Sequence, residues 1–164
     1  MKKIIAVGYA TFLFVLTALG QTNLNSSYFQ TLTARALGPS TMSGRITAIE
    51  GIVISDQLNL YVGTAGGGVW KSQNGGVSFS PVFDKYNQSI GAIAIDKTNP
   101  RTVYVGTGES NMRNSVSIGD GLFKTTDGGS NWQKIGLDST EHISKIIIDP
   151  NDSKILYVAA PGPL

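Results

Sequence analysis

The sequence predicts an all-β chain, and three observations support this. Two stretches of the 164-residue chain open with Tyr-Val-Gly-Thr, at Tyr61 and Tyr104, and a related Tyr-Val-Ala-Ala begins at Tyr157. Short apolar runs alternate with turns rich in Gly, Asn and Asp, and no helical periodicity competes with them after residue 20. Twenty glycines and six prolines supply many tight turns. Repeats of roughly 40 to 50 residues built only from strands are typical of the blades of a β-propeller.

The first residues indicate export. Lys2 and Lys3 precede an apolar run over 4–19, and small residues stand at positions 18 and 20, before Gln21. This predicts a cleaved signal peptide at 1–20, followed by a polar leader at 21–36. The alternative is an uncleaved membrane anchor, because the run is near the lower length limit of a spanning helix. We expect a secreted or periplasmic protein, bacterial in origin, with no stable membrane span after signal cleavage.

Composition excludes several classes of function. The net charge is +2 and the 13 basic residues are scattered, so a nucleic-acid partner is not expected. The chain has no cysteine, which excludes disulfides, thiolate metal sites and a cysteine nucleophile. We expect no cofactor and no metal. The oligomeric state stays open.

Each repeat has the same order of parts. Apolar first strands are expected at 46–54, 90–95 and 143–148, second strands at 60–64, 103–107 and 156–160, third strands at 68–71 and 121–124, and fourth strands from Phe79 and Trp132. Four short antiparallel strands make one blade. We therefore expect a partial propeller over 37–164, with blade 1 at about 45–84, blade 2 at about 89–136 and the start of blade 3 at about 143–160. About two and a half blades cannot close a ring of typically four to eight, so a fragment of a longer protein is expected.

Two polar turns, at 72–79 and 125–132, share one pattern: Ser or Thr, any residue, Asp or Asn, any residue, Gly, any residue, a small polar residue and an aromatic. The Asp or Asn side chain can accept backbone N–H groups, the Gly can take positive φ, and the aromatic can pack between sheets. The pattern resembles the Asp-box, or BNR repeat, of sialidase-type, xyloglucan-hydrolase-type and sortilin-type propellers. We expect a structural role for its residues here, which are Ser72, Asn74, Gly76, Phe79, Thr125, Asp127, Gly129 and Trp132.

Strand order places the candidate site. In a four-stranded meander the loop between the second and third strands lies at the same rim as the chain leading into the first strand, and the Asp-box turns lie at the opposite rim. The first such loop is short, since 61–72 spans 12 residues, whereas 104–125 spans 22, and the additional residues are polar. Long insertions on a rigid scaffold often carry function. The candidate ligand-binding residues are Arg45, Glu109, Arg113, Asn114 and Asp120; the alternative is a solvated loop with ion pairs inside itself.

Glu109 and Asp120 are also the candidate catalytic residues, because glycosidases generally need two carboxylates about 5 to 9.5 Å apart. The resemblance argues partly against this assignment. In xyloglucan-hydrolase propellers a catalytic Asp follows the Thr of an equivalent strand, but here Ala65 and Gly108 follow Thr64 and Thr107. The Arg-Ile-Pro motif of sialidases is replaced by Arg-Ile-Thr from Arg45. His142, the only histidine, receives no role.

A wider resemblance covers about 37–164. The segments 38–45, 66–71 and 106–121 are similar to the N-terminal part of large secreted bacterial proteins described as BNR-repeat glycosyl hydrolases or sortilin-like propellers. Two functions follow from it. The first is a sortilin-like binding scaffold for a peptide, protein or glycan. The second is part of a secreted glycoside hydrolase, sialidase-like or xyloglucan-hydrolase-like, with its remaining catalytic residues outside this sequence.

Overall fold

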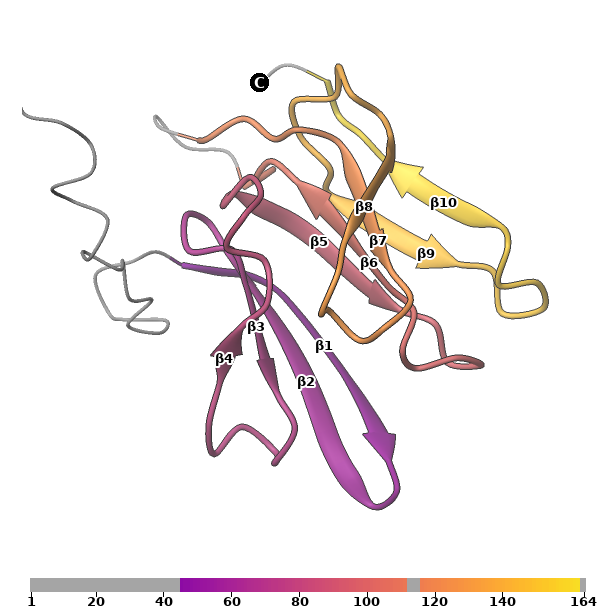
Figure 1. Cartoon of the computed structure of the whole chain (residues 1–164). Helices are drawn as coiled ribbons and strands as arrows, with labels where there is room; N and C mark the ends of the chain where they lie inside the picture. The colour runs from indigo at the N-terminus through magenta and orange to yellow at the C-terminus, as the bar shows by residue number, and fades with distance from the viewer. Residues whose placement is uncertain (1–44, 112–115, 163–164) are drawn as a thin grey trace, which may run out of the picture. The chain divides into compact units, whose positions relative to one another are not determined.

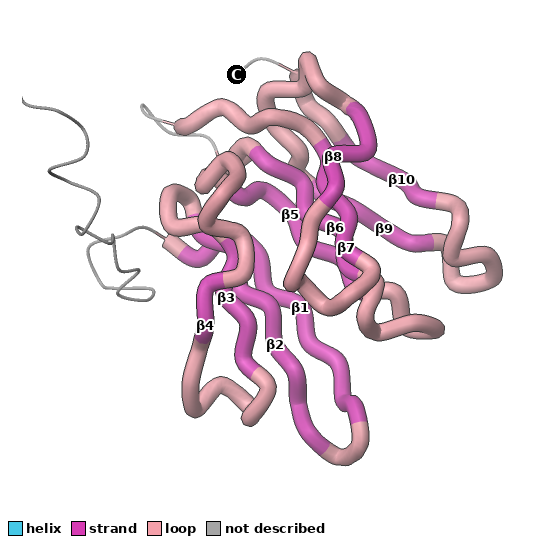
Figure 2. The backbone as a smooth tube through the Cα atoms, viewed as in Figure 1, coloured by secondary structure: helices cyan, strands magenta, loops and turns pink. Residues whose placement is uncertain are grey.

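The computed structural model describes residues 45–111 and 116–162. Within these ranges the chain forms ten strands and no helix (Figures 1 and 2). The strands are β1 (Ile46–Ile54), β2 (Gln57–Thr64), β3 (Val69–Ser72), β4 (Ser80–Pro81), β5 (Ile90–Ile95), β6 (Val103–Thr107), β7 (Leu122–Thr125), β8 (Gln133–Gly136), β9 (Lys145–Ile148) and β10 (Leu156–Ala159). The predicted signal peptide, the leader and the candidate residues Arg113 and Asn114 lie outside the described residues.

The strands form three antiparallel sheets in chain order, as Figure 1 shows. The first sheet has the order β1-β2-β3-β4, the second has the order β5-β6-β7-β8, and β9 pairs with β10. The first strands of both four-stranded sheets carry a register shift at the same place, between Ile46 and Ala48 in β1 and between Ile90 and Ala92 in β5. The repeat in the sequence is thus a repeat of backbone geometry, and the predicted all-β fold class is confirmed.

The core lies on both faces of the second sheet, because side chains alternate in direction along a strand. In β5 and β6, Ile93 and Val105 belong to the cluster shared with the first sheet. Ala94 and Tyr104 belong to the cluster that packs against β9 and β10. A sheet that is apolar on both faces is stable only between two neighbours, so the second sheet lies between the other two.

Both polar turns form the hydrogen bonds expected from their pattern. In the second turn, Asp127 Oδ1 accepts the hydroxyl of Thr125 at 2.7 Å and the backbone N–H of Asn131 at 3.0 Å. These bonds hold the pKa of the Asp127 carboxyl well below its usual range, with the Asn131 N–H as the largest cause. In the first turn, Asn74 Oδ1 accepts the hydroxyl of Ser72 at 2.9 Å in the same way. Asn therefore replaces Asp without loss of the local geometry.

The second turn also joins the first two sheets. Its Trp132 donates from Nε1 to the carbonyl of Val82 at 2.7 Å, and its ring meets Phe83 edge to face at 5.1 Å. The carbonyl of Gly128 accepts the hydroxyl of Tyr61 at 3.0 Å and the ammonium of Lys71 at 2.8 Å. The aromatic residue of this turn therefore packs between sheets.

The fourth strand of the first sheet is short. The sequence predicts it from Phe79, but β4 contains only Ser80 and Pro81. Pro81 pairs with Trp70 of β3 but has no N–H to donate, and one further backbone bond follows it, from the Val82 N–H to the Val69 carbonyl at 3.0 Å. The chain then turns inward to bury Phe83 completely between the sheets. No helix able to reach across a bilayer is present within 45–111 or 116–162.

Candidate functional site

The loops that join β2 to β3 and β6 to β7 begin and end with the same threonine arrangement. Thr64 Oγ1 donates to the carbonyl of Gly68 at 3.1 Å and accepts the N–H of Gly67 at 2.7 Å. Thr107 Oγ1 donates to the carbonyl of Gly121 at 2.8 Å and accepts the N–H of Asp120 at 2.6 Å. Two residues separate Thr64 from Gly67, and twelve separate Thr107 from Asp120. The longer loop is therefore the short one with ten residues inserted at a fixed stem.

The stem of this insertion is packed against backbone. Gly119 N–H donates to the carbonyl of Glu141 at 2.6 Å, and the Ile143 N–H donates to the carbonyl of Gly108 at 3.3 Å. A Cβ on Gly108, whose φ is +83°, would lie 1.9 Å from the Glu141 oxygen. The position directly after Thr107 therefore has no room for a side chain, which explains in physical terms why no carboxylate follows that threonine.

Glu109 is the first inserted residue, and it is buried, with 2% of its side chain exposed. Its carboxylate forms an ion pair and hydrogen bond with the guanidinium of Arg45, which lies just before β1. The Glu109 N–H donates to Ser89 Oγ at 3.0 Å, and Ser89 Oγ donates to the carbonyl of Ser117 at 3.0 Å. The sequence predicts Arg45 and Glu109 on the same rim, and the structure brings them into contact.

Asp120 closes the same insertion, but its carboxylate has a different partner. Lys134 of β8 contacts Asp120 Oδ1 at 2.5 Å and Asp138 Oδ1 at 2.9 Å. These hydrogen bonds raise the pKa of Lys134, with that to Asp120 as the largest cause. About half of the Asp120 side chain is exposed. Glu109 and Asp120 thus lie on one loop, and each is paired with a different cation.

Sequence reasoning missed one part of this rim, the role of Ser89. Ser89 orders the start of the insertion through its hydroxyl, but a lone serine before a strand carries no signal of such a role. His142, to which the sequence assigned no role, is buried; its Nδ1 has no hydrogen-bond partner among the residues that the structure describes, and its Nε2 lies 3.9 Å from Glu141 Oε2. Within 45–111 and 116–162, no group of three or more His, Cys, Asp or Glu residues is placed to hold a metal ion.

No family model matches the chain. A xyloglucanase from a Paenibacillus species is 27% identical over 129 residues, which cover 68% of this chain and 12% of the relative. Among solved structures, a GH74 enzyme from Niastella koreensis superposes with a TM-score of 0.51 and 25% identity, covering 62% of this chain and 15% of that one. An ancestral GH74 enzyme superposes with a TM-score of 0.56 and 23% identity, covering 70% and 16%.

The chain therefore spans less than a fifth of the length of each of these proteins. The sequence similarity to the xyloglucanase is weak. The likeness to the two GH74 structures is a likeness of backbone fold. The described residues have the all-β, propeller-type fold of GH74 enzymes.

Proposed function

We propose that this chain is part of a glycoside-hydrolase propeller that acts on a xyloglucan-type polysaccharide, and that the rim of the β6–β7 loop contacts that polysaccharide. The observation that carries the proposal is the ten-residue polar insertion, held on a rigid stem by Thr107, in a chain similar to a xyloglucanase. Rigid stems place loop side chains reproducibly, as substrate binding requires. The signal peptide predicted at 1–20 would export the protein from the cytoplasm, to a compartment where it can encounter a polysaccharide.

The two candidate carboxylates suit a positioning role, in which they hold the insertion in place, better than proton transfer. A glycosidase acid must be protonated and must reach the glycosidic oxygen. The Glu109 carboxylate is buried and paired with the guanidinium of Arg45. Asp120 is paired with Lys134. We assign both to the positioning of the insertion, and the acid and base of hydrolysis to residues outside the two described loops.

A second candidate function is a sortilin-like scaffold that binds a peptide, protein or glycan without turnover. The observation that favours it is the same pairing of Glu109 and Asp120, which leaves neither carboxylate of the β6–β7 loop ready for chemistry. The hydrolase predicts turnover of the bound polysaccharide and the scaffold predicts none, whereas both predict that the rim of the β6–β7 loop contacts the ligand.

The test uses the native protein that contains this sequence, with xyloglucan and other polysaccharides as substrates. Release of reducing ends gives kcat and KM for the native protein and for Glu109→Gln, Asp120→Asn and Asp56→Asn. Asp56 is a matched control, because it lies in the β1–β2 turn at the opposite rim and its φ of 62° suits Asn.

We expect Glu109→Gln to raise KM several-fold with kcat within about twofold of native, because it disturbs the placement of the insertion and removes no proton donor. Asp120→Asn should act in the same direction and more weakly, since Asp120 is half-exposed. A fall of kcat by about a hundredfold in either variant at unchanged KM would identify a catalytic residue and contradict the assignment. Binding of a peptide or protein without any turnover would favour the scaffold.

A further inference from the structure

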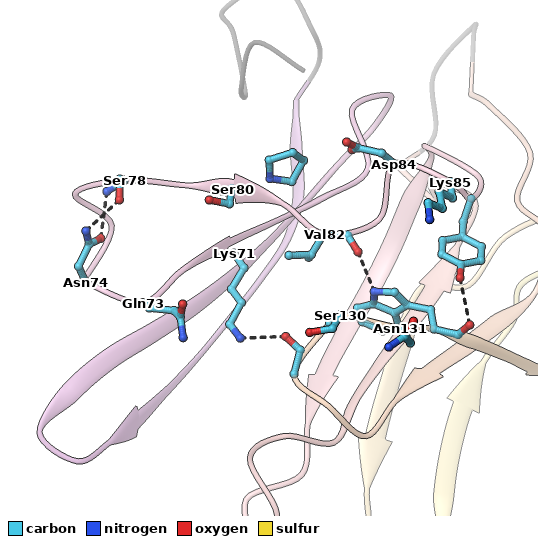
Figure 3. A pocket seen from close by; sticks show the side chains of 15 residues that line it. Lys71, Gln73, Asn74, Ser78, Ser80, Val82, Asp84, Lys85, Ser130 and Asn131 are labelled. Atoms are coloured by element: carbon cyan, nitrogen blue, oxygen red, sulfur yellow. Dashed lines mark hydrogen bonds between the residues drawn. The ribbon is translucent and has the colours of Figure 1, made fainter. Parts of the chain in front are cut away.

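A cavity of about 630 Å³ lies between the first two sheets on the side of the polar turns. One wall is the first turn with β4, and the other is the second turn, as Figure 3 shows. We call it the turn groove. Because β3 runs from Val69 at the loop rim to Ser72 at the turn rim, Gln73 and the facing Ser130 stand at the opposite end of the sheets from the stem of the β6–β7 insertion.

The two walls are fixed to each other by hydrogen bonds between the sheets. Lys71 and Tyr61 both donate to the carbonyl of Gly128, and Trp132 donates to the carbonyl of Val82. Tyr86, which also lines the groove, donates from its hydroxyl to the carbonyl of Trp132 at 3.1 Å. A cavity whose walls are bonded together is formed before any ligand arrives, which lowers the entropic cost of binding.

The lining suits a ligand with many hydroxyl groups. Gln73, Ser80 and Ser130 are exposed, come from both walls and offer both donors and acceptors. Three charged side chains line the groove. The Lys71 ammonium is bonded to the carbonyl of Gly128, and the other two, Asp84 and Lys85, carry opposite charges, so the lining does not select strongly for an anion or a cation. The half-buried ring of Tyr86 offers an apolar surface of the kind on which the C–H face of a sugar packs.

We propose that the turn groove is a second binding site, for a neutral oligosaccharide, separate from the rim that carries the insertion. A site of this kind holds a polysaccharide chain on the protein without taking part in its cleavage. The choice of saccharide rests on the proposed function, but the existence of the groove does not.

The experiment is hydrogen exchange and calorimetric titration of the native protein with a xyloglucan heptasaccharide as the probe. We expect the probe to slow amide exchange within 73–86 and 128–132. The double variant Gln73→Ala/Lys85→Ala should raise the Kd of this site at least tenfold and abolish that protection. The matched control Gln133→Ala/Lys97→Ala removes the same side chains from exposed positions outside the groove, and its Kd should stay within about twofold of native.

Protection of 107–121 reports separately on the proposed function, so failure of one proposal leaves the other standing. Protection confined to 107–121 would overturn the turn groove and support the rim. An unchanged Kd in Gln73→Ala/Lys85→Ala would overturn it as well. Binding of an acidic oligogalacturonide in place of the neutral probe would refute the ligand class.

Discussion

Truncation of Trp132 tests whether the polar turns hold the sheets together. Trp132 is 8% exposed, packs edge to face on Phe83 at 5.1 Å and donates to the carbonyl of Val82 at 2.7 Å. Truncation of a buried aromatic to Ala costs about 3–5 kcal/mol. The Val82 carbonyl also loses its donor, which adds about 1 kcal/mol. Trp132→Ala should therefore lower the free energy of unfolding by about 4–6 kcal/mol, a large part of an ordinary domain's stability.

The assay is equilibrium unfolding of the native protein in urea, followed by far-UV circular dichroism because the variant removes a fluorophore. Phe79→Ala is the matched control, since Phe79 has the same place in the first turn and is only half-buried. It should cost about 1 kcal/mol or less. Trp132→Phe keeps an aromatic ring and should cost about 1–2 kcal/mol, mostly through the lost hydrogen bond. A loss below about 1 kcal/mol for Trp132→Ala, or one equal to that of Phe79→Ala, would refute the joining role.

Three further predictions concern glycine packing and pH. Gly119→Ala places a Cβ 2.4 Å from the Thr107 carbonyl carbon, whereas a Cβ on Gly66, at the same place in the shorter loop, meets open space. Gly119→Ala should therefore lower the free energy of unfolding in urea by about 1–3 kcal/mol more than Gly66→Ala does. The depressed pKa of Asp127 adds stability that is present above its unfolded pKa of about 4 and is lost as the pH falls through the lower folded pKa. In Asp127→Asn, the free energy of unfolding should therefore fall less between neutral pH and acid pH than it does in the native protein. An equal fall in the two proteins would contradict this prediction. Burial, and secondarily the charge of Asp127, raises the pKa of Tyr61 to about 12. The contribution of Tyr61 to the free energy of unfolding is therefore fully present below its unfolded pKa of about 10, and it is lost as the pH rises through its folded pKa. Ultraviolet titration of the native protein against Tyr61→Phe should show one phenol ionising late, and equal titration curves would contradict this.

The strands are predictable from the sequence because local chemistry decides them. The Tyr-Val-Gly-Thr copies become the ends of β2 and β6, since alternating bulky residues pack on both sides of a sheet. The polar turns are predictable for a similar reason, because Asp127 and Thr125 bond within their own turn. The fourth strand, predicted from Phe79, is Ser80–Pro81 in the structure, and the burial of Phe83 that follows it is a tertiary effect that no local pattern encodes.

For the candidate site, the sequence predicts which end of the sheets the residues occupy but not which residues contact one another. Strand order puts Arg45 and Glu109 at the same end of the sheets, but their contact depends on the course of the inserted loop between sheets. The pairing of Asp120 with Lys134 joins a loop to a strand 14 positions later, and no sequence periodicity encodes it. The turn groove depends on how two turns dock across a sheet boundary, so it appears only in three dimensions.

The proposed function places this chain in a propeller that cleaves a xyloglucan-type polysaccharide. Reducing-end release from xyloglucan by the folded native protein tests it most directly, with mannan as the comparison polysaccharide. We predict measurable turnover of xyloglucan, retained in Asp56→Asn, with little or no turnover of mannan. Folded protein that does not cleave xyloglucan, whether or not it binds it, would contradict the proposal.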